Sequence, residues 1–155
     1  MINIKNLREF LIEAKKSTYA SGDAAHKVKE YDKSTTLVFE SGDFKYHDNY
    51  FGGEPFGGRE VVFFKGAPIY IMTYYGLVNK AIADCNGVYR VLQHALSLIP
   101  ENKPYRGPNE YVDGAYIYLN KSIGEIDDFS GEEIIKLDGR EIYRARYVGG
   151  LVDQR

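Results

Sequence analysis

Apolar residues recur at helical spacing in two separate segments of the chain. In residues 3–17 the apolar side chains fall on one face and the charged ones on the other, which predicts an amphipathic helix with Asn3 as its N-cap. Residues 87–99 show the same period and are followed by Pro100, which cannot continue a helix. The sequence therefore predicts two main helices.

After each helix, apolar and polar residues alternate with a period of two, as is typical of half-buried strands. The alternating segments lie at residues 35–40, 44–51, 59–65 and 68–76, and again at 115–121, 132–138 and 140–148. Turn residues separate them, and Asp138-Gly139 is the strongest hairpin signal. Residues 18–34 and 101–114 show no period, so we expect a long polar loop and a turn-rich linker there.

The chain contains one stretch twice. It reads FGGREVVFFKGAPIYIMTYYG from Phe56 to Gly76 and, 73 residues later, FSGEEIIKLDGREIYRARYVG from Phe129 to Gly149. Eight of the 21 aligned positions are identical, and three more keep an apolar residue. Each stretch has the pattern of a β-hairpin that turns at a glycine, so we interpret the pair as a duplicated hairpin.

This repeat predicts the architecture. The two halves, approximately residues 3–76 and 87–150, each read as a helix followed by an antiparallel meander. We expect a single α+β domain over residues 1–155, with an internal duplication, a pseudo-two-fold axis and two main helices packed on antiparallel sheet. The halves could bury their sheet faces against each other, or form one continuous curved sheet with both helices on one side.

The two copies differ on one face of the sheet. The face that carries Tyr74 stays apolar or aromatic in both copies, which is typical of core. The opposite face carries Phe63, Ile71 and Tyr75 in the first copy, where the second copy has two basic residues and a valine. The first copy therefore needs a cover on this face, which could be the loop 18–34, a ligand or another subunit.

This asymmetry places the candidate site on the first copy. The residues expected to bind a ligand are Tyr46, Tyr50, Glu54, Arg59, Phe63, Ile71, Tyr74 and Tyr75. The favoured function is a non-catalytic binding domain for a small, partly apolar ligand. The alternatives are a protein-interaction or homodimerisation module that uses the same surface, and an enzyme with Tyr, His and carboxylate groups in the same cleft. A closed pocket would favour the ligand, a flat apolar patch the dimer, and convergent perturbed titratable groups the enzyme.

The composition argues against nucleic acid and membrane as binding partners. The net charge is −2 and the isoelectric point about 5.9, so no basic face for nucleic acid is expected. No apolar stretch is long enough to span a membrane, and the N-terminus lacks the apolar run of a signal peptide. The single Cys85 cannot form an internal disulfide, which favours a reducing, cytoplasmic location.

No motif of a known chemistry is present. The glycine-rich stretch at residues 52–58 is followed by a strand rather than by a helix, so it is interpreted as a bulged connection and not as a phosphate-binding loop. We expect neither a cofactor nor a metal site. Glu60 and Glu133 are duplicated with the fold, which favours a structural role as buried ion-pair or hydrogen-bond partners. Arg106 is expected to form a salt bridge to the first half, and the period of two places His47 on the face opposite Asp48.

The whole chain resembles a family of uncharacterised bacterial and archaeal domains. The resemblance rests on LREFLIEAKKSTYA (7–20), YHDNYFGGEPFGGREVVFFKGAPIYIMTYYG (46–76), NKPYRGPNEYVDGAYIY (102–118) and FSGEEIIKLDGREIYRARYVGG (129–150). Members of this family also occur C-terminal to the helix-turn-helix of Xre-type regulators, which implies an effector-sensing or dimerising module. The resemblance assigns no function and no catalytic residues. Because this chain begins at the first helix of the domain, DNA binding is not implied.

Overall fold

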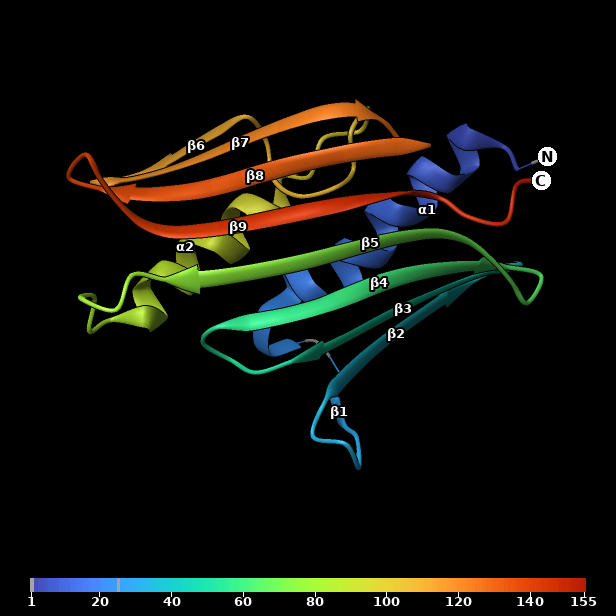
Figure 1. Ribbon diagram of the computed structural model, residues 1–155, viewed down its shortest axis with the longest axis horizontal. Coiled ribbons are helices and arrows are strands. Elements are labelled where there is room, and N and C mark those ends of the chain that lie inside the picture. Colours follow the sequence, from blue (N-terminus) through green and yellow to red (C-terminus); the bar gives the residue numbers. More distant parts are fainter. Residues whose placement is uncertain (1, 25) are drawn as a thin grey trace.

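The two main helices lie against one face of a broad antiparallel sheet (Figure 1). The structure is a computed structural model that describes residues 2–24 and 26–155, and these residues form a nine-stranded sheet. The strands lie in the order β1-β2-β3-β4-β5-β9-β8-β7-β6. Of the two arrangements that the sequence allows, the chain therefore adopts the continuous sheet with both helices on one side.

The elements of the first half are α1 (Ile4–Ser17), the 3-10 helix η1 (Tyr19–Ala24) and the strands β1 (Val28–Lys29), β2 (Thr35–Ser41), β3 (Phe44–Phe51), β4 (Phe56–Phe64) and β5 (Ala67–Val78). The elements of the second half are α2 (Cys85–Ser97) and the strands β6 (Glu110–Asp113), β7 (Tyr116–Glu125), β8 (Asp128–Leu137) and β9 (Arg140–Leu151).

Both helices begin at side-chain caps. The Asn3 carboxamide accepts a hydrogen bond from the Asn6 backbone N–H at 3.2 Å, which confirms the predicted N-cap of α1. Asp84 accepts one from the Gly87 N–H at 3.1 Å, so α2 begins two residues earlier than its apolar period indicates. A Cβ at Gly87 would lie 2.6 Å from Asp84 Oδ2, which explains the glycine. The apolar faces of the two helices are buried: Leu7, Phe10, Leu11 and Ala14 on α1, and Val88, Val91, Leu92 and Ala95 on α2.

The β4–β5 and β8–β9 hairpins have the same register. Phe56 pairs with Gly76 in the first and Phe129 with Gly149 in the second. Each hairpin also has a register shift near its turn, after Val62 in the first and at the equivalent position in the second. Both turns place two residues at positive φ, namely Lys65-Gly66 and Asp138-Gly139. The predicted hairpins and the positions of their turns are confirmed.

Strands β5 and β9 join the two halves in the middle of the sheet. They pair antiparallel, and Tyr74 lies directly opposite Tyr147. We call the helix-covered side the inner face and the other side the outer face. Side chains of the inner face pack against both helices and form the core, whose largest fully buried members include Tyr46, Tyr70, Tyr118, Tyr143 and Phe129.

The structure corrects the expectation for residues 18–34. Instead of an irregular loop over the outer face, this segment contains η1, which packs against α1 and α2, and β1, which pairs with β2 at the sheet edge. The segment 101–114 likewise contains the short edge strand β6. Both edge strands were missed because two to four partly exposed residues give no clear alternation.

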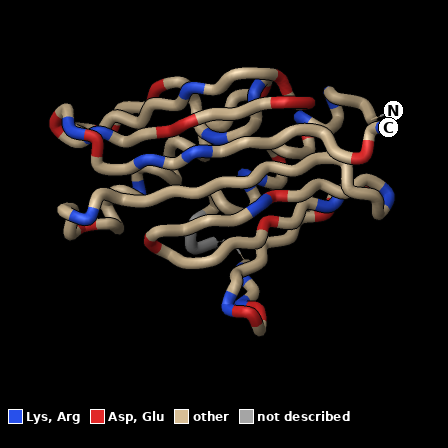
Figure 2. Tube along the Cα trace, in the orientation of Figure 1, with Lys and Arg blue, Asp and Glu red and all other residues tan. Residues whose placement is uncertain are grey.

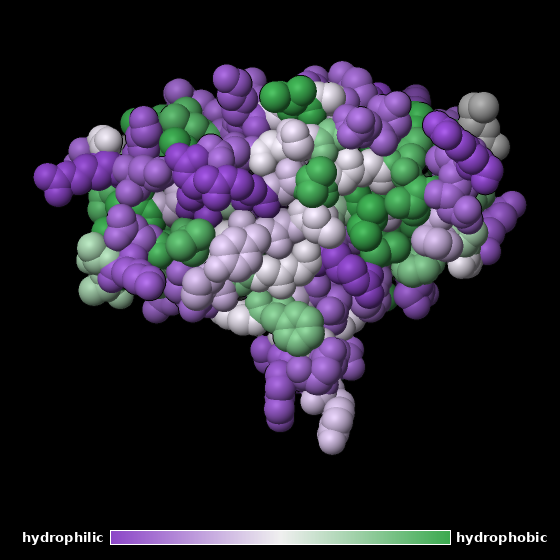
Figure 3. Space-filling model, viewed as in Figure 1, coloured by the Kyte–Doolittle hydropathy of each residue, from purple (hydrophilic) through white to green (hydrophobic). Residues whose placement is uncertain are grey.

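The outer face of the first half is open. Figure 3 views this face, which the helices do not cover in Figure 1. Phe63 and Ile71 are partly exposed there, and the Tyr75 side chain is 55% exposed. Acidic and basic residues are interspersed along the chain, and residues of both charges occur in the hairpin that contains β1 (Figure 2). Among the described residues, neither helix has the length and hydropathy needed to cross a membrane.

Candidate ligand-binding site

Five ionisable side chains are buried between the sheet and the helices. Asp48, Glu60 and Glu133 project from the inner face of β3, β4 and β8, while Lys15 comes from α1 and Arg106 from the segment after α2. Charged groups are rarely buried unless they are paired, because leaving water costs several kcal/mol. These residues therefore form two polar clusters, one in each half of the sheet.

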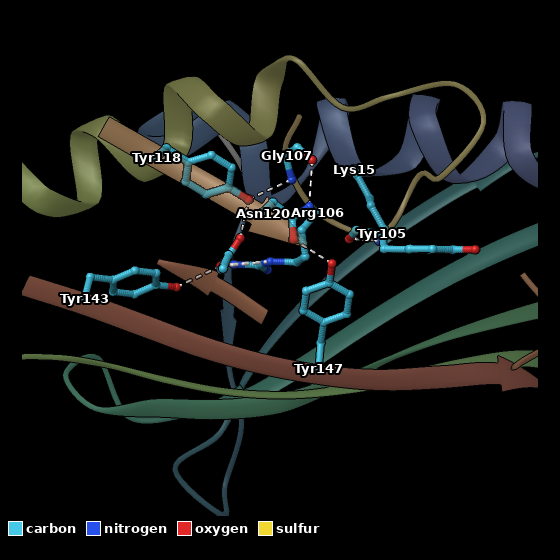
Figure 4. A network of polar contacts seen from close by, with 9 residues as sticks. Lys15, Tyr105, Arg106, Gly107, Tyr118, Asn120, Tyr143 and Tyr147 are labelled. Atoms are coloured by element: carbon cyan, nitrogen blue, oxygen red, sulfur yellow. Dashed lines mark hydrogen bonds and ion pairs between the residues drawn. The ribbon is translucent and has the colours of Figure 1, made fainter. Parts of the chain in front are cut away.

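In the Glu133 cluster, which comprises Glu133, Arg106, Tyr118 and Tyr143, both carboxylate oxygens of Glu133 accept hydrogen bonds (Figure 4). Arg106 donates from Nε and Nη2 to Glu133 Oε1 at 3.1 and 2.5 Å. The Tyr118 hydroxyl donates to Oε2 at 2.5 Å, and the Tyr143 hydroxyl donates to Oε1 at 2.9 Å. The predicted structural role of Glu133 is confirmed, but Arg106 pairs within the second half rather than with the first.

The Glu60 cluster has the same plan but is incomplete. Tyr46 and Tyr70 occupy the positions that Tyr118 and Tyr143 hold in the second half, and Lys15 supplies the cation. Lys15 Nζ lies 2.9 Å from Glu60 Oε2, without the angle of a hydrogen bond, and donates to the Tyr105 carbonyl at 2.6 Å. Within the described part of the chain, Glu60 Oε2 and the hydroxyls of Tyr46 and Tyr70 have no hydrogen-bond partner. The predicted ion-pair role of Glu60 is confirmed, with unused hydrogen-bonding capacity around it.

A further carboxylate adjoins the Glu60 cluster. Asp48 lies directly across from Glu60 in the β3–β4 register and accepts a hydrogen bond from the Tyr74 hydroxyl at 2.5 Å. Burial, together with the Glu60 charge, raises the pKa of Asp48 to about 7. In the second half the equivalent residue is the neutral Asn120, whose Oδ1 accepts from the Tyr147 hydroxyl at 2.7 Å. The carboxylate that distinguishes the first half therefore titrates near neutral pH.

A small cavity lies between the two clusters. Its volume, measured as the space open to the centre of a water-sized sphere, is about 10 Å³, enough for about one water molecule. Lys15, Glu60 and Arg106 line it together with Tyr19, Ala20, Leu96, Ile99 and Tyr105. The buried charges thus face a space that is too small for an organic ligand.

A larger cleft opens beside this cavity, and Tyr19 lines both. The cleft has a volume of about 380 Å³ by the same measure. We call it the tyrosine cleft because its apolar walls are Tyr19, Tyr50, Phe56, Tyr74 and Tyr89. Its remaining lining is Lys27, Lys29, Lys33, Thr35, Gly52, Gly53 and Gln93. Tyr74 connects the cleft to the buried carboxylate of Asp48.

The glycine-rich connection between β3 and β4 forms one wall of the cleft. Gly52 has a φ of 78°, and a Cβ there would lie 2.4 Å from the Pro55 carbonyl oxygen, so only glycine fits. Glu54 fixes this wall, because it accepts a hydrogen bond from the Val78 N–H at 2.7 Å and another from the Tyr89 hydroxyl. The expected bulged connection therefore shapes a concave surface.

The structure divides the predicted site residues between the two faces of the sheet. Tyr50 and Tyr74 line the tyrosine cleft, Glu54 supports its wall, and Tyr46 is buried in the Glu60 cluster. The other four, Arg59, Phe63, Ile71 and Tyr75, lie on the outer face. One pocket containing all eight residues is thus not formed, because strand positions that differ by an odd number point to opposite faces.

Sequence reasoning missed several residues of the cleft. Tyr89 of α2, Tyr19 of η1 and the three lysines come from segments without a strand repeat, so the comparison of the two copies could not select them. Asp48 did carry a signal, since its alternation with His47 predicted opposite faces. The structure confirms this, with Asp48 buried and His47 partly exposed on the other side. Within residues 2–24 and 26–155, no group of His, Cys, Asp or Glu is arranged to hold a metal ion.

Comparison with known proteins identifies a family but no function. The model of a family described as a domain of unknown function, DUF5680, matches residues 48–152. No curated protein and no solved structure matches the chain. The matched segment covers β3 to β9 and α2, including the Glu133 cluster and much of the tyrosine cleft. The chain belongs to the DUF5680 family.

Proposed function

We propose that this member of the DUF5680 family binds a small, partly apolar ligand in the tyrosine cleft and acts as a cytoplasmic effector-sensing module. The observation that carries the proposal is the cleft itself, about 380 Å³ with five aromatic side chains. Ligand sites in proteins are typically concave, mostly apolar and about 300–1,000 Å³ in volume, with a few convergent polar groups. Tyr74, hydrogen-bonded to Asp48, and the carbonyl of Gly53 are such groups here.

The two tyrosine hydroxyls of the cleft are better suited to binding than to catalysis as bases or nucleophiles. Burial, together with the Asp48 charge, raises the pKa of Tyr74 well above its ordinary value. Burial and the hydrogen bond to Glu54 do the same for Tyr89. Both hydroxyls therefore stay protonated at neutral pH and already donate hydrogen bonds within the protein. They can recognise a ligand but are unsuited to act as bases or nucleophiles.

A screen of small, partly apolar fragments by two-dimensional amide NMR tests the proposal. We expect the fragments that bind to shift resonances of Tyr50, Phe56 and Tyr89. The Tyr50→Ala variant should weaken their binding about tenfold, because it removes one aromatic wall of the cleft. The matched control Tyr75→Ala removes an exposed tyrosine from the outer face and should leave binding unchanged. Shifts confined to Phe63, Ile71 and Tyr75 would place the site on the outer face and overturn the proposal.

A second candidate function is homodimerisation through the outer face. The Tyr75 and Val148 side chains are 55% and 54% exposed there, with Phe63 and Ile71 partly exposed beside them. Phe63 lies on β4, Ile71 and Tyr75 lie on β5, and Val148 lies on β9, so these apolar side chains come from three adjacent strands. Contiguous exposed apolar residues often mark contact surfaces.

We further infer that the chain arose by duplication of a helix and meander about a pseudo-two-fold axis. The equal registers of the two hairpins, their equivalent bulges and the pairing of Tyr74 with Tyr147 support this. On this inference, the Glu133 cluster keeps a purely structural role. The Glu60 cluster has diverged next to the cleft, which supports a binding site in the first half.

A further inference from the structure

We infer that the ligand of the tyrosine cleft is an amphipathic organic acid, with an aromatic or planar apolar part and a carboxylate, sulfonate or phosphate group. This inference rests on the proposed function and adds the chemical class of the ligand. Of the twelve residues that line the cleft, three are lysines and none is Asp or Glu. The chain as a whole has more acidic than basic residues, 22 against 20, so the cleft departs from the average of the chain.

The three lysines of the cleft are available to bind an anion. Within the described residues, Lys27, Lys29 and Lys33 form no ion pair. Lys29 Nζ donates to the Thr35 hydroxyl at 2.7 Å, a neutral acceptor that leaves its charge uncompensated. A cation that lacks an internal counter-ion at the rim of a cleft with aromatic walls favours a negatively charged ligand group.

The nearby carboxylates form hydrogen bonds with neutral groups and do not line the cleft. Glu54 accepts from the Val78 N–H and the Tyr89 hydroxyl, and Asp48 lies behind the Tyr74 hydroxyl. Asp32, in the same hairpin as the lysines, accepts from the backbone and the hydroxyl of Ser34 at 3.0 and 2.5 Å. Among the nearby carboxylates whose side chains the structure describes, the exposed Glu30 lacks such a bond, and it does not line the cleft.

The lining is polarised along the cleft. All three lysines and Thr35 come from one stretch, residues 27–35, which contains β1 and the start of β2. The aromatic walls come from β3, β4, β5, α2 and η1, and Tyr50 of β3 pairs with Thr35 where the two parts of the lining meet. An amphipathic acid fits this arrangement with its anionic group toward β1 and its ring between the tyrosines.

Two fluorescent probes of nearly the same shape test the inference. Anilinonaphthalene sulfonate carries one sulfonate, and N-phenylnaphthylamine is its neutral counterpart. We expect the anionic probe to bind the full chain about three- to tenfold more tightly at low salt, and added salt to reduce this preference. The double variant Lys29→Gln/Lys33→Gln should abolish the preference without weakening the neutral probe. The matched control Lys45→Gln/Lys65→Gln alters lysines that do not line the cleft and should preserve it.

The outcomes separate this inference from the proposed function. The two probes could bind with equal affinity, shift the NMR signals of Tyr50 and Tyr89, and be unaffected by the lysine changes. This result would overturn the anionic class of the ligand but would leave the cleft as a ligand site. A preference lost equally in the Lys45/Lys65 control would show a non-specific charge effect and would also overturn it. Failure of both probes to bind would overturn the inference, and the fragment screen would then decide on the proposed function. Near-native amide spectra of each variant exclude unfolding as the cause.

Discussion

Asp48 and Asn120 occupy equivalent positions in the two halves and differ by one chemical group. Asp48 accepts a hydrogen bond from the Tyr74 hydroxyl, and Asn120 accepts one from the Tyr147 hydroxyl. These two tyrosines pair with each other across β5 and β9. The amide is neutral at every pH, whereas the carboxylate belongs to a buried set of three carboxylates and two cations. The excess negative charge is relieved when Asp48 takes up a proton.

The Asp48→Asn variant should therefore be more stable than the parent protein at pH 8. In the folded state the pKa of Asp48 is raised to about 7, above its unfolded value of about 3.9. The stability associated with the bound proton is then fully present below the unfolded pKa and is lost as the pH rises through the folded pKa. The difference in unfolding free energy should approach about 4 kcal/mol at pH 8 and shrink toward pH 4. Urea unfolding of both proteins across this range measures it, and parallel curves would contradict the assignment.

At the scale of elements, the turns of the β4–β5 and β8–β9 hairpins depend on residues at positive φ. Gly139 has a φ of 79°, and a Cβ at this position would meet no atom within 4 Å. We expect Gly139→Ala to cost about 1–2 kcal/mol, purely because an L-residue is disfavoured in this conformation. Gly53 is a matched control, since a Cβ there also meets nothing but its φ is not in the left-handed region. Urea unfolding should show a clearly smaller loss for Gly53→Ala, and equal losses would refute the conformational explanation.

The regular elements could be predicted because their signals are local. The period of α1 and its Asn3 cap, the alternation of β3 and the Asp138-Gly139 turn all follow from neighbouring residues. The side of the sheet that the helices cover depends on contacts between distant segments, which one sequence does not specify. The residues of the site were predicted less completely for the same reason. Comparison of the two copies selected differences on both faces, whereas the cleft is completed by Tyr19 and Tyr89 from outside the repeat.

For the whole molecule, the two faces of β5 should respond oppositely to the same substitution. Ile71 is partly exposed on the outer face, whereas Met72, its neighbour, is fully buried under the helices. We expect Ile71→Arg to leave the domain folded, and Met72→Arg to cost several kcal/mol because it buries an unpaired charge. Thermal melting separates the two outcomes. A melting temperature of Ile71→Arg that collapses as far as that of Met72→Arg would show the outer face to be core.

The same variant tests the second candidate function. If the outer face mediates homodimerisation, sedimentation velocity should show a concentration-dependent dimer for the parent protein and a monomer for Ile71→Arg. A parent protein that sediments as a monomer at every concentration would exclude this candidate. Binding of fragments in the tyrosine cleft should persist in Ile71→Arg, because Ile71 does not line that cleft.

Charged residues at the two ends of the sheet protect the molecule from aggregation. An open nine-stranded sheet offers unpaired backbone N–H and C=O groups at its two ends, on which another chain could add a strand. The end strands β1 and β6 are only two and four residues long, so much of β2 and β7 also lacks an outer neighbour. Lys27 and Lys29 lie at the first edge, and Glu110 and Asp113 are the first and last residues of the strand at the second edge. The lysines that we assign to ligand recognition thus also keep that edge soluble, so selection on either property would preserve them.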